Sequence, residues 1–269
     1  MSDDVLNAEE IKSCLHTKWL GQSIYCRETV DSTNTWARRL AAEGAVHGTV
    51  VFAEEQTSGK GRRGRGWVMP KGSSVAMTCI LRPQLNPQNA SMLTLVMGLS
   101  VAQACRRLYQ VEAMIKWPND IVISGKKICG ILTEMNVRDD HIRDLVIGVG
   151  INGNLTNFPA ELAETASSIQ TELGHAISRA PLSAAVLEQF ESNYEKFCVY
   201  EDFSQLQGDY NRILINQNRK VRVLEIGHEW EGTARGIDTR GELLVEKEDH
   251  TVAAVSAGEV SVRGVYGYV

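Results

Sequence analysis

AMIKWPNDIVISGKKICGILTEMNVRDDHIRDLVIGVGIN, residues 113–152, is the stretch of the sequence that decides the fold class. Three of its segments are dominated by apolar and β-branched residues, which predicts strands over residues 113–117, 127–137 and 145–152. Because the turn Ser124-Gly125-Lys126 lies between the first two segments, we expect them to be neighbouring antiparallel strands of one sheet.

The sequence on either side adds two strands and a set of helices. Residues 49–53 begin with three β-branched residues and residues 74–81 alternate, so both segments are predicted strands. Helices are expected over residues 29–44, 91–108 and 182–200, where apolar residues recur three and four apart. Asp31 or Ser32 is expected to cap the first of these helices. The mixture predicts an α+β fold built on a mixed β-sheet with helices.

After about residue 208 the pattern changes to short strands at close spacing. They are expected over residues 220–226, 229–236, 242–247 and 252–255, with turn residues between them. This spacing is typical of a small all-β barrel. We therefore divide the chain into a mixed-sheet domain of residues 1–207 and a small β-barrel domain of residues 208–269.

The composition excludes several classes of protein. The 269 residues carry a net charge of −5, which argues against general nucleic-acid binding because that binding depends on neutralising phosphates. The N-terminus lacks a basic segment followed by an apolar run, and the longest apolar stretch, residues 92–104, is too short to cross a bilayer. The six cysteines form no CxxC pair and the six histidines are scattered, so we expect a cytoplasmic protein with reduced thiols and no zinc site.

The most informative segment for function is residues 59–67, Gly-Lys-Gly-Arg-Arg-Gly-Arg-Gly-Trp, in which four cations alternate with four glycines. Glycine lets backbone N–H groups approach an anion closely, and arginine matches phosphate and carboxylate oxygens. We predict a mobile loop that closes over a polyanionic small molecule. A solvated or nucleic-acid-binding segment is the alternative. The G-x-G-x-x-G spacing is not a dinucleotide site, because no helix begins at the third glycine.

Three further stretches carry polar groups suited to a ligand. In Lys116-Trp117-Pro118-Asn119-Asp120, the Asn119 amide can read an adenine edge and the Asp120 carboxylate can hold Mg²⁺. Lys127 begins a strand three residues before Gly130, which suggests a ligand-binding cation, whereas Lys126 is expected to face solvent. Asp31-Ser32-Thr33-Asn34, with Gln56, would suit a buried neutral group such as a urea. A plain capped turn and simple helix capping are the alternatives for the first and third stretches.

The order of these stretches, followed by Gly148-Val149-Gly150-Ile151-Asn152, resembles the biotin protein ligase family. The resemblance covers about residues 28–155 closely. It resumes at Arg235-Gly236-Ile237-Asp238 and Gly258-Glu259-Val260-Ser261-Val262-Arg263, which look like the SH3-like C-terminal domain of that family.

The resemblance implies a role for each matching residue. Lys127 and Arg62 are the implied catalytic residues, and Asp120 is the candidate ligand of Mg²⁺. The implied biotin-binding residues are Ser32, Thr33, Asn34, Gln56, Lys60, Gly61, Arg62, Lys127 and Gly130. The implied ATP- or adenylate-binding residues are Arg62, Arg65, Trp67, Asn119, Lys127 and Asn152. Lys60 departs from the family, whose loop often carries arginine there, so its contact is less fixed.

The resemblance also implies a reaction. Biotin and ATP would form biotinyl-5′-AMP with Mg²⁺, and the biotinyl group would pass to a lysine of a biotin carboxyl carrier protein or domain. We expect no DNA partner, because the 30 residues before Asp31 leave no room for the winged-helix domain of repressor members. We expect no membrane partner either, and a monomer or homodimer. The alternatives are a lipoate ligase of related fold, a ligand-responsive regulator without turnover, and a bare scaffold.

Overall fold

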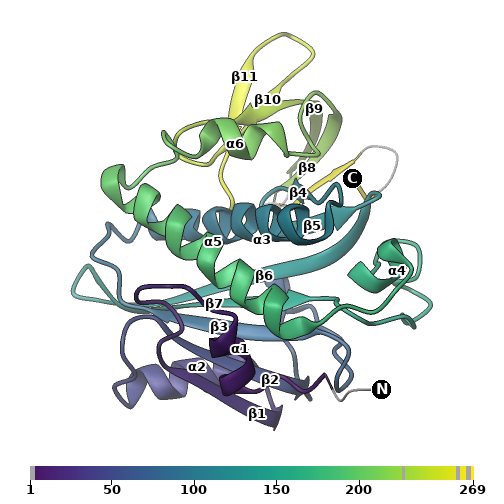
Figure 1. The fold of residues 1–269 in the computed structure, drawn as a ribbon. Coiled ribbons are helices and arrows are strands. Elements are labelled where there is room, and N and C mark those ends of the chain that lie inside the picture. Colours follow the sequence, from purple (N-terminus) through teal and green to yellow (C-terminus); the bar gives the residue numbers. More distant parts are fainter. Residues whose placement is uncertain (1–3, 226–227, 259–260, 265–267) are drawn as a thin grey trace.

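The computed structural model describes residues 4–225, 228–258, 261–264 and 268–269. Within these residues seven strands form a mixed sheet of order β1-β2-β3-β7-β6-β5-β4 (Figure 1). β1 and β2 are parallel, and every other neighbouring pair is antiparallel. The strands are β1 Ile24–Val30, β2 Thr49–Gln56, β3 Val75–Leu81, β4 Met114–Lys116, β5 Asp120–Ile123, β6 Lys126–Arg138 and β7 His141–Ile151.

The predicted pairing of residues 113–117 with residues 127–137 is wrong, because β5 lies between β4 and β6. The chain reverses at Pro118-Asn119 and forms β5 at once, so β4 pairs with β5. Ser124 and Gly125 both have positive φ, as a two-residue hairpin turn requires, and they join β5 to β6. β5 has only four residues, which is too few for its alternation to be recognised in the sequence.

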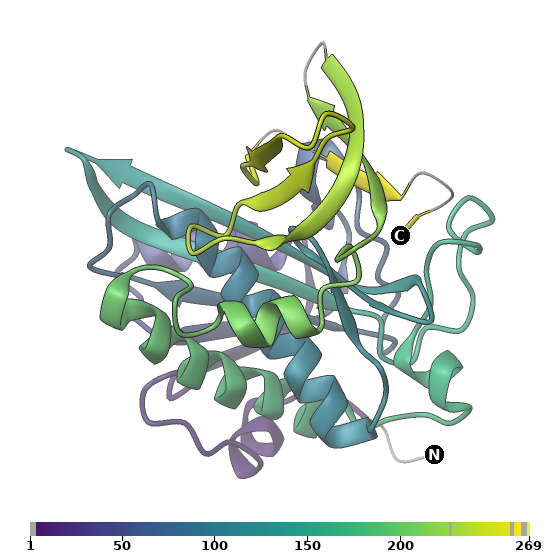
Figure 2. The same cartoon turned by 90° about the horizontal axis from the view of Figure 1, so that it is seen from above.

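Helices cover both faces of the sheet. α3 and α5 pack side by side on one face, and α2 lies on the other (Figures 1 and 2). α2 begins later than predicted, because Thr29 and Val30 belong to β1. The helical segments are α1 Ala8–Ser13, α2 Thr33–Ala42, η1 Arg62–Gly64, η2 Ala90–Met92, α3 Leu93–Tyr109, α4 Ile169–Leu173, α5 Arg179–Tyr200 and α6 Gln207–Arg212. No helix in the described part of the chain is long and apolar enough to cross a membrane.

β7 shows how the sequence separates the core from the site. Leu145, Ile147 and Val149 alternate along the strand and all join the large core that includes α3 and α5. The residues between them point to the opposite face, where Gly148 and Gly150 leave room. A Cβ at Gly148 would lie 2.0 Å from Asn34 Oδ1, so this glycine admits the start of α2.

The C-terminal segment forms a second, antiparallel sheet of order β11-β10-β9-β8-β12. Its strands are β8 Lys220–Glu225, β9 His228–Ile237, β10 Leu243–Glu246, β11 Val252–Val255 and β12 Ser261–Gly264. Four of these strands were predicted, and β12 was not. Ile226, at the end of a predicted strand, and Glu259-Val260 of the quoted motif lie outside the described residues. The pairings of the described strands leave an open sheet, so the predicted SH3-like barrel is not confirmed.

The second sheet lies beside β4 and β5 (Figure 1). Trp117 directly follows β4 and fixes this contact. Its backbone N–H donates to Asn216 Oδ1 at 3.0 Å, and its indole N–H donates to the carbonyl of Gly241 at 3.1 Å. The large apolar core continues from the first sheet into the second through residues such as Val221 and Leu243. The division at residues 207 and 208 stays a prediction.

Candidate functional site

Two adjoining cavities lie beneath the loop that joins β2 to β3, called here the glycine–arginine loop (residues 59–67). The larger cavity has a volume of about 650 Å³ and the smaller one about 50 Å³. The residues that line both are Gly61, Arg62, Trp67, Asn119 and Lys127. The two cavities therefore form one site, whose junction is built from residues that the sequence singled out.

Trp67 forms a wall of the junction and rests on the backbone of two strands. Gly130 and Gly150 oppose each other in β6 and β7. A Cβ at Gly150 would lie 2.6 Å from the Trp67 indole, and one at Gly130 would lie 3.1 Å from it. The buried Trp67 Nε1 has no hydrogen-bond partner within the described residues. The two glycines thus leave room for the Trp67 ring against the strands. The indole N–H of Trp67 is available to an acceptor on a ligand.

The smaller cavity brings together the polar residues predicted from the start of α2 and the end of β2. Ser32, Thr33, Asn34 and Gln56 all line it. Gln56 Oε1 accepts hydrogen bonds from the Thr33 backbone N–H at 2.8 Å and from the Thr33 hydroxyl at 3.1 Å. Ser32 occupies the N-cap position of α2, but its side chain makes no capping bond. Of the two expected caps, Asp31 or Ser32, only Asp31 bonds at this end, where its Oδ1 accepts from the Ser32 backbone N–H at 2.8 Å. The buried Ser32 hydroxyl is therefore not used by the helix.

Asn34 differs from these neighbours because its amide is already engaged. Its Nδ2 donates to the Leu132 carbonyl at 3.1 Å and to Glu134 Oε2 at 2.8 Å. Its Oδ1 accepts from the Thr78 hydroxyl at 2.8 Å. Asn34 thus joins α2 to β3 and β6, which suits a residue that shapes the cavity wall.

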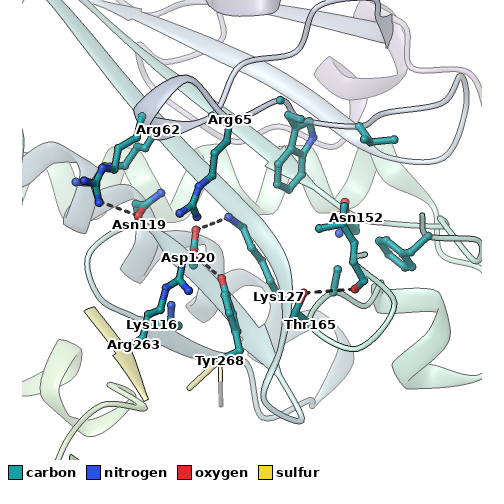
Figure 3. A pocket seen from close by; sticks show the side chains of 18 of the residues that line it. Arg62, Arg65, Lys116, Asn119, Asp120, Lys127, Asn152, Thr165, Arg263 and Tyr268 are labelled. Carbon is teal, nitrogen blue, oxygen red and sulfur yellow. Dashed lines mark hydrogen bonds and ion pairs between the residues drawn. The ribbon is translucent and has the colours of Figure 1, made fainter. Parts of the chain in front are cut away.

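The glycine–arginine loop is held by its own backbone and by Arg62. Gly61 N–H donates to the Arg65 carbonyl at 2.7 Å, and Trp67 N–H donates to the Gly59 carbonyl at 2.9 Å. The Arg62 guanidinium donates to Asn119 Oδ1 at 3.1 Å (Figure 3). It also donates to the carbonyls of Ala257 at 2.6 Å and Gly258 at 2.7 Å. Lys60 lies at the smaller cavity, where its Nζ donates to the Thr35 hydroxyl at 3.0 Å.

Asp120 is the centre of an ionic network at the larger cavity. Its Oδ1 lies 2.6 Å from Lys127 Nζ, and its Oδ2 accepts a hydrogen bond from the Tyr268 hydroxyl (Figure 3). Lys116 Nζ lies 3.9 Å from the centroid of the Tyr268 ring. Burial alone would raise the pKa of Asp120, but the charges of Lys127 and Lys116 outweigh it and hold that pKa below its ordinary value. Asp120 is therefore an internal counter-ion for the two lysines.

The same network bears on the prediction that Asp120 holds Mg²⁺. Each oxygen of Asp120 already faces a partner, Lys127 on one side and Tyr268 on the other. Among the residues that the structure describes, no cluster of three or more His, Cys, Asp or Glu side chains could hold a metal ion. A single carboxylate among lysines is not an all-protein cage for a divalent cation, but Mg²⁺ is commonly bound by one or two carboxylates together with substrate phosphates. The role of Asp120 as a Mg²⁺ ligand therefore stays a prediction, for a cation held jointly by its carboxylate and the phosphates of ATP.

The larger cavity has a cationic end and a mixed apolar and polar end. In Figure 3 Arg65, Lys116 and Arg263 lie at one end and Asn152 and Thr165 at the other, with Lys127 between them. The Asn152 amide donates to the Ser167 carbonyl at 3.0 Å. Apolar residues from the segment after β7 also line the cavity, namely Leu155, Phe158 and Leu162. The cavity suits an elongated ligand with an anionic end and a flat, partly apolar end.

The lining residues that were not assigned a role from the sequence include Lys116, Phe158, Arg263 and Tyr268. Lys116 is the first residue of the motif that ends at Asp120, and that motif could have indicated its place in the site. Arg263 closes a motif that was used only for resemblance. Phe158 and Tyr268 carry no motif, and only the folded chain brings them to the site.

Family models match two parts of the chain. Residues 26–152 match the biotin/lipoate A/B protein ligase family, and residues 218–263 match the biotin protein ligase C-terminal domain. The first range contains all of the predicted site residues. The second contains Arg263 and the carbonyls that bind Arg62.

Curated relatives and a solved structure agree with these models. The chain is 35% identical to the bifunctional ligase/repressor BirA of Bacillus subtilis, over 91% of this chain and 75% of that one. It is 35% identical to the biotin–[acetyl-CoA-carboxylase] ligase of Mycobacterium tuberculosis, over 85% of each chain. It is similar to the biotin protein ligase of Aquifex aeolicus solved with biotin and ATP, with a TM-score of 0.78, 28% identity and coverage of 90% and 99%.

Proposed function

The chain belongs to the biotin/lipoate A/B protein ligase family, and on that premise we propose that it joins biotin to ATP and transfers the biotinyl group to a protein lysine. In the first step a biotin carboxylate oxygen attacks the α-phosphorus of ATP, and pyrophosphate leaves. In the second step a lysine amine attacks the carbonyl carbon of biotinyl-5′-AMP, loses a proton, and AMP leaves.

The observation that carries this proposal is the shared junction of the two cavities. The smaller cavity presents neutral hydrogen-bonding groups from Ser32, Thr33 and Gln56, which suit the ureido ring of biotin. The larger cavity presents cations for a triphosphate. Lys127 and Arg62 line both, so the biotin carboxylate and the α-phosphate would meet beside them. Holding two reactants in such an orientation can lower the barrier by about 7–11 kcal/mol.

The electrostatics of the larger cavity match the charge of the reaction. Its cationic side chains are Arg62, Arg63, Arg65, Lys116, Lys127 and Arg263, against the carboxylates of Asp120 and Glu161. Cations fixed in place before the reaction stabilise charge as it develops on the α-phosphate. Since Mg²⁺ is commonly bound through substrate phosphates, we propose that it enters on the phosphates of ATP, and we derive no step through it.

The second sheet contributes to the nucleotide side of the site. Val262, Arg263 and Tyr268 line the larger cavity, and the Ala257 and Gly258 carbonyls hold Arg62. We propose that this sheet supports ATP binding and that the acceptor is a biotin carboxyl carrier protein or domain.

The test is a reaction of the purified protein with ATP, Mg²⁺, biotin and a biotin carboxyl carrier domain. We expect the mass of the acceptor to increase by one biotinyl group, and only when all components are present. The same reaction with lipoate in place of biotin should give no product. A product with lipoate and none with biotin would favour a lipoate ligase instead.

Gly150, on which the Trp67 ring rests, gives the first variant to test. A Cβ at Gly150 would lie 2.6–2.8 Å from three atoms of the indole, so Gly150→Ala must push the ring off the strand. Overpacking of this kind costs about 1–3 kcal/mol, and we expect the affinity for ATP to fall roughly tenfold. Calorimetric titration with ATP measures the change.

Gly208→Ala is the matched control, because a Cβ there would meet nothing within 4 Å. Gly208 lies in α6, away from the cavities, so its variant should bind ATP like the parent protein. If Gly150→Ala also bound ATP normally, Trp67 would have no part in the nucleotide site.

The pKa of Lys116 predicts how ATP binding depends on pH. Burial lowers the pKa of Lys116 to about 8, although the charge of Asp120 partly opposes the shift. Lys116 is therefore a cation below pH 8 and becomes neutral above it. Between pH 7 and pH 9 we expect the Kd for ATP to rise by up to about tenfold, as the protonated fraction falls from most to little.

Calorimetric titrations of ATP at a series of pH values measure this dependence. Lys116→Arg keeps its charge over the same range, so its Kd for ATP should stay flat. A parent protein whose Kd did not change above pH 8 would show that Lys116 does not bind phosphate.

A further inference from the structure

Tyr268 reaches the ionic network from beyond β12 and contacts two of its members. Its hydroxyl donates to Asp120 Oδ2, and its ring lies 3.9 Å from Lys116 Nζ. Figure 3 shows the side chain pointing into the larger cavity toward Asp120. Tyr268 thus makes both a hydrogen bond and a cation–π contact, which is more than lining the cavity requires. Both contacts involve charged groups of the proposed reaction.

Lys127 has two possible sets of partners and cannot contact both at once. In the described structure it pairs with Asp120 at 2.6 Å. In the proposed reaction it must turn to the biotin carboxylate and the α-phosphate. When it does so, Asp120 loses its nearest cation while buried, which is costly unless another donor remains. The Tyr268 hydroxyl is on the other oxygen, Oδ2, and can stay there as Lys127 moves.

We propose that Tyr268 is a positioning residue for biotinyl-AMP formation, which holds the Asp120 carboxylate while Lys127 turns to the reactants and holds Lys116 at the phosphate end of the cavity. The inference rests on the proposed ligase function. It assigns Tyr268 to the first step of the reaction, and to the nucleotide side of the site. The smaller cavity does not include Tyr268, so biotin binding should not depend on it.

Two substitutions separate the two contacts. Tyr268→Phe removes the hydroxyl and keeps the ring over Lys116, so kcat for adenylate formation should fall roughly tenfold, the scale of a hydrogen bond to a charged group. The KM values for ATP and biotin should stay within about twofold. Tyr268→Ala also removes the ring, so it should show the same loss of kcat and, in addition, a KM for ATP that rises about threefold to tenfold.

The experiment measures biotin-dependent exchange of pyrophosphate into ATP, which reports the first step alone. Transfer from preformed biotinyl-AMP to the acceptor is measured beside it and should be unchanged in Tyr268→Phe. Tyr200→Phe is the control, since Tyr200 is an exposed tyrosine at the end of α5. Thermal unfolding of each variant excludes a loss of folded protein.

Asp120→Asn supplies the decisive comparison. If Tyr268 acts through the Asp120 carboxylate, adding Tyr268→Phe to Asp120→Asn should change kcat for exchange by less than about twofold. A full tenfold loss in that background, or a normal kcat in Tyr268→Phe alone, would overturn the inference. An unsubstituted protein with no biotin-dependent exchange would instead overturn the proposed function, so the two failures are distinguishable.

Discussion

Lys127→Ala is expected to slow biotinyl-AMP formation roughly 10²–10³-fold, the loss typical of removing one group that stabilises developing charge. Lys127 lines both cavities and so lies where the carboxylate of biotin and the α-phosphate of ATP would meet. The amine would help to neutralise the carboxylate as it approaches, and the phosphate as its charge grows. Biotin-dependent pyrophosphate exchange measures the rate, and calorimetry measures whether biotin still binds.

Lys126→Ala is the matched control for this variant. The two lysines are adjacent in β6, but only Lys127 lines the cavities. We expect Lys126→Ala to keep the parent rate. Because Lys127→Ala also leaves Asp120 without its ion pair, thermal unfolding must accompany the rates. An exchange rate for Lys127→Ala within threefold of the parent would remove Lys127 from the catalytic role.

The parts of this fold that the sequence predicts are those whose signal is local. The helices α3 and α5 have long apolar repeats. The strands β6 and β7 have enough residues for a strand pattern to be recognised. β5 is short and follows a turn, so its pairing was missed and the order of that edge was wrong. Pairing depends on the whole sheet, and a segment of four residues has too little pattern to reveal it.

The site residues also divide into those with a local signal in the sequence and those that only the folded chain brings together. Ser32, Gln56 and Lys127 each stand at the boundary of a helix or strand, and a polar motif there indicates a ligand before the fold is known. Tyr268 has no motif, and the distance in sequence from Asp120 hides their contact. The role implied for Asn34 stays a prediction, although its amide bonds to Leu132, Glu134 and Thr78 show that it also joins α2 to the sheet.

Arg62→Gly is expected to release biotinyl-AMP roughly 100-fold faster than the parent, the scale of losing hydrogen bonds from a charged group, and to label lysines of bystander proteins. The smaller cavity, at about 50 Å³, is well below the ~300–1,000 Å³ of typical ligand sites, so we infer that the glycine–arginine loop moves to admit biotin. Arg62 donates to Asn119 and to two carbonyls that follow β11, and these bonds would hold the loop closed over the adenylate. Hydrogen bonds from a charged group stabilise by about 1.5–3 kcal/mol each, so losing them favours an open loop.

Release of the adenylate is measured by trapping free biotinyl-AMP after rapid gel filtration, and labelling is measured by mass spectrometry of a bystander protein mixed with the acceptor. Arg62→Met tests the side chain without adding a glycine to the loop and should also release the adenylate early. Lys71→Gly is the matched control: Lys71 is an exposed cation in the same β2–β3 connection and lines neither cavity, so retention should not change. If Arg62→Gly and Arg62→Met both kept the acceptor as their only target, the loop would not be a lid, and the adenylate would be retained by the walls of the larger cavity instead.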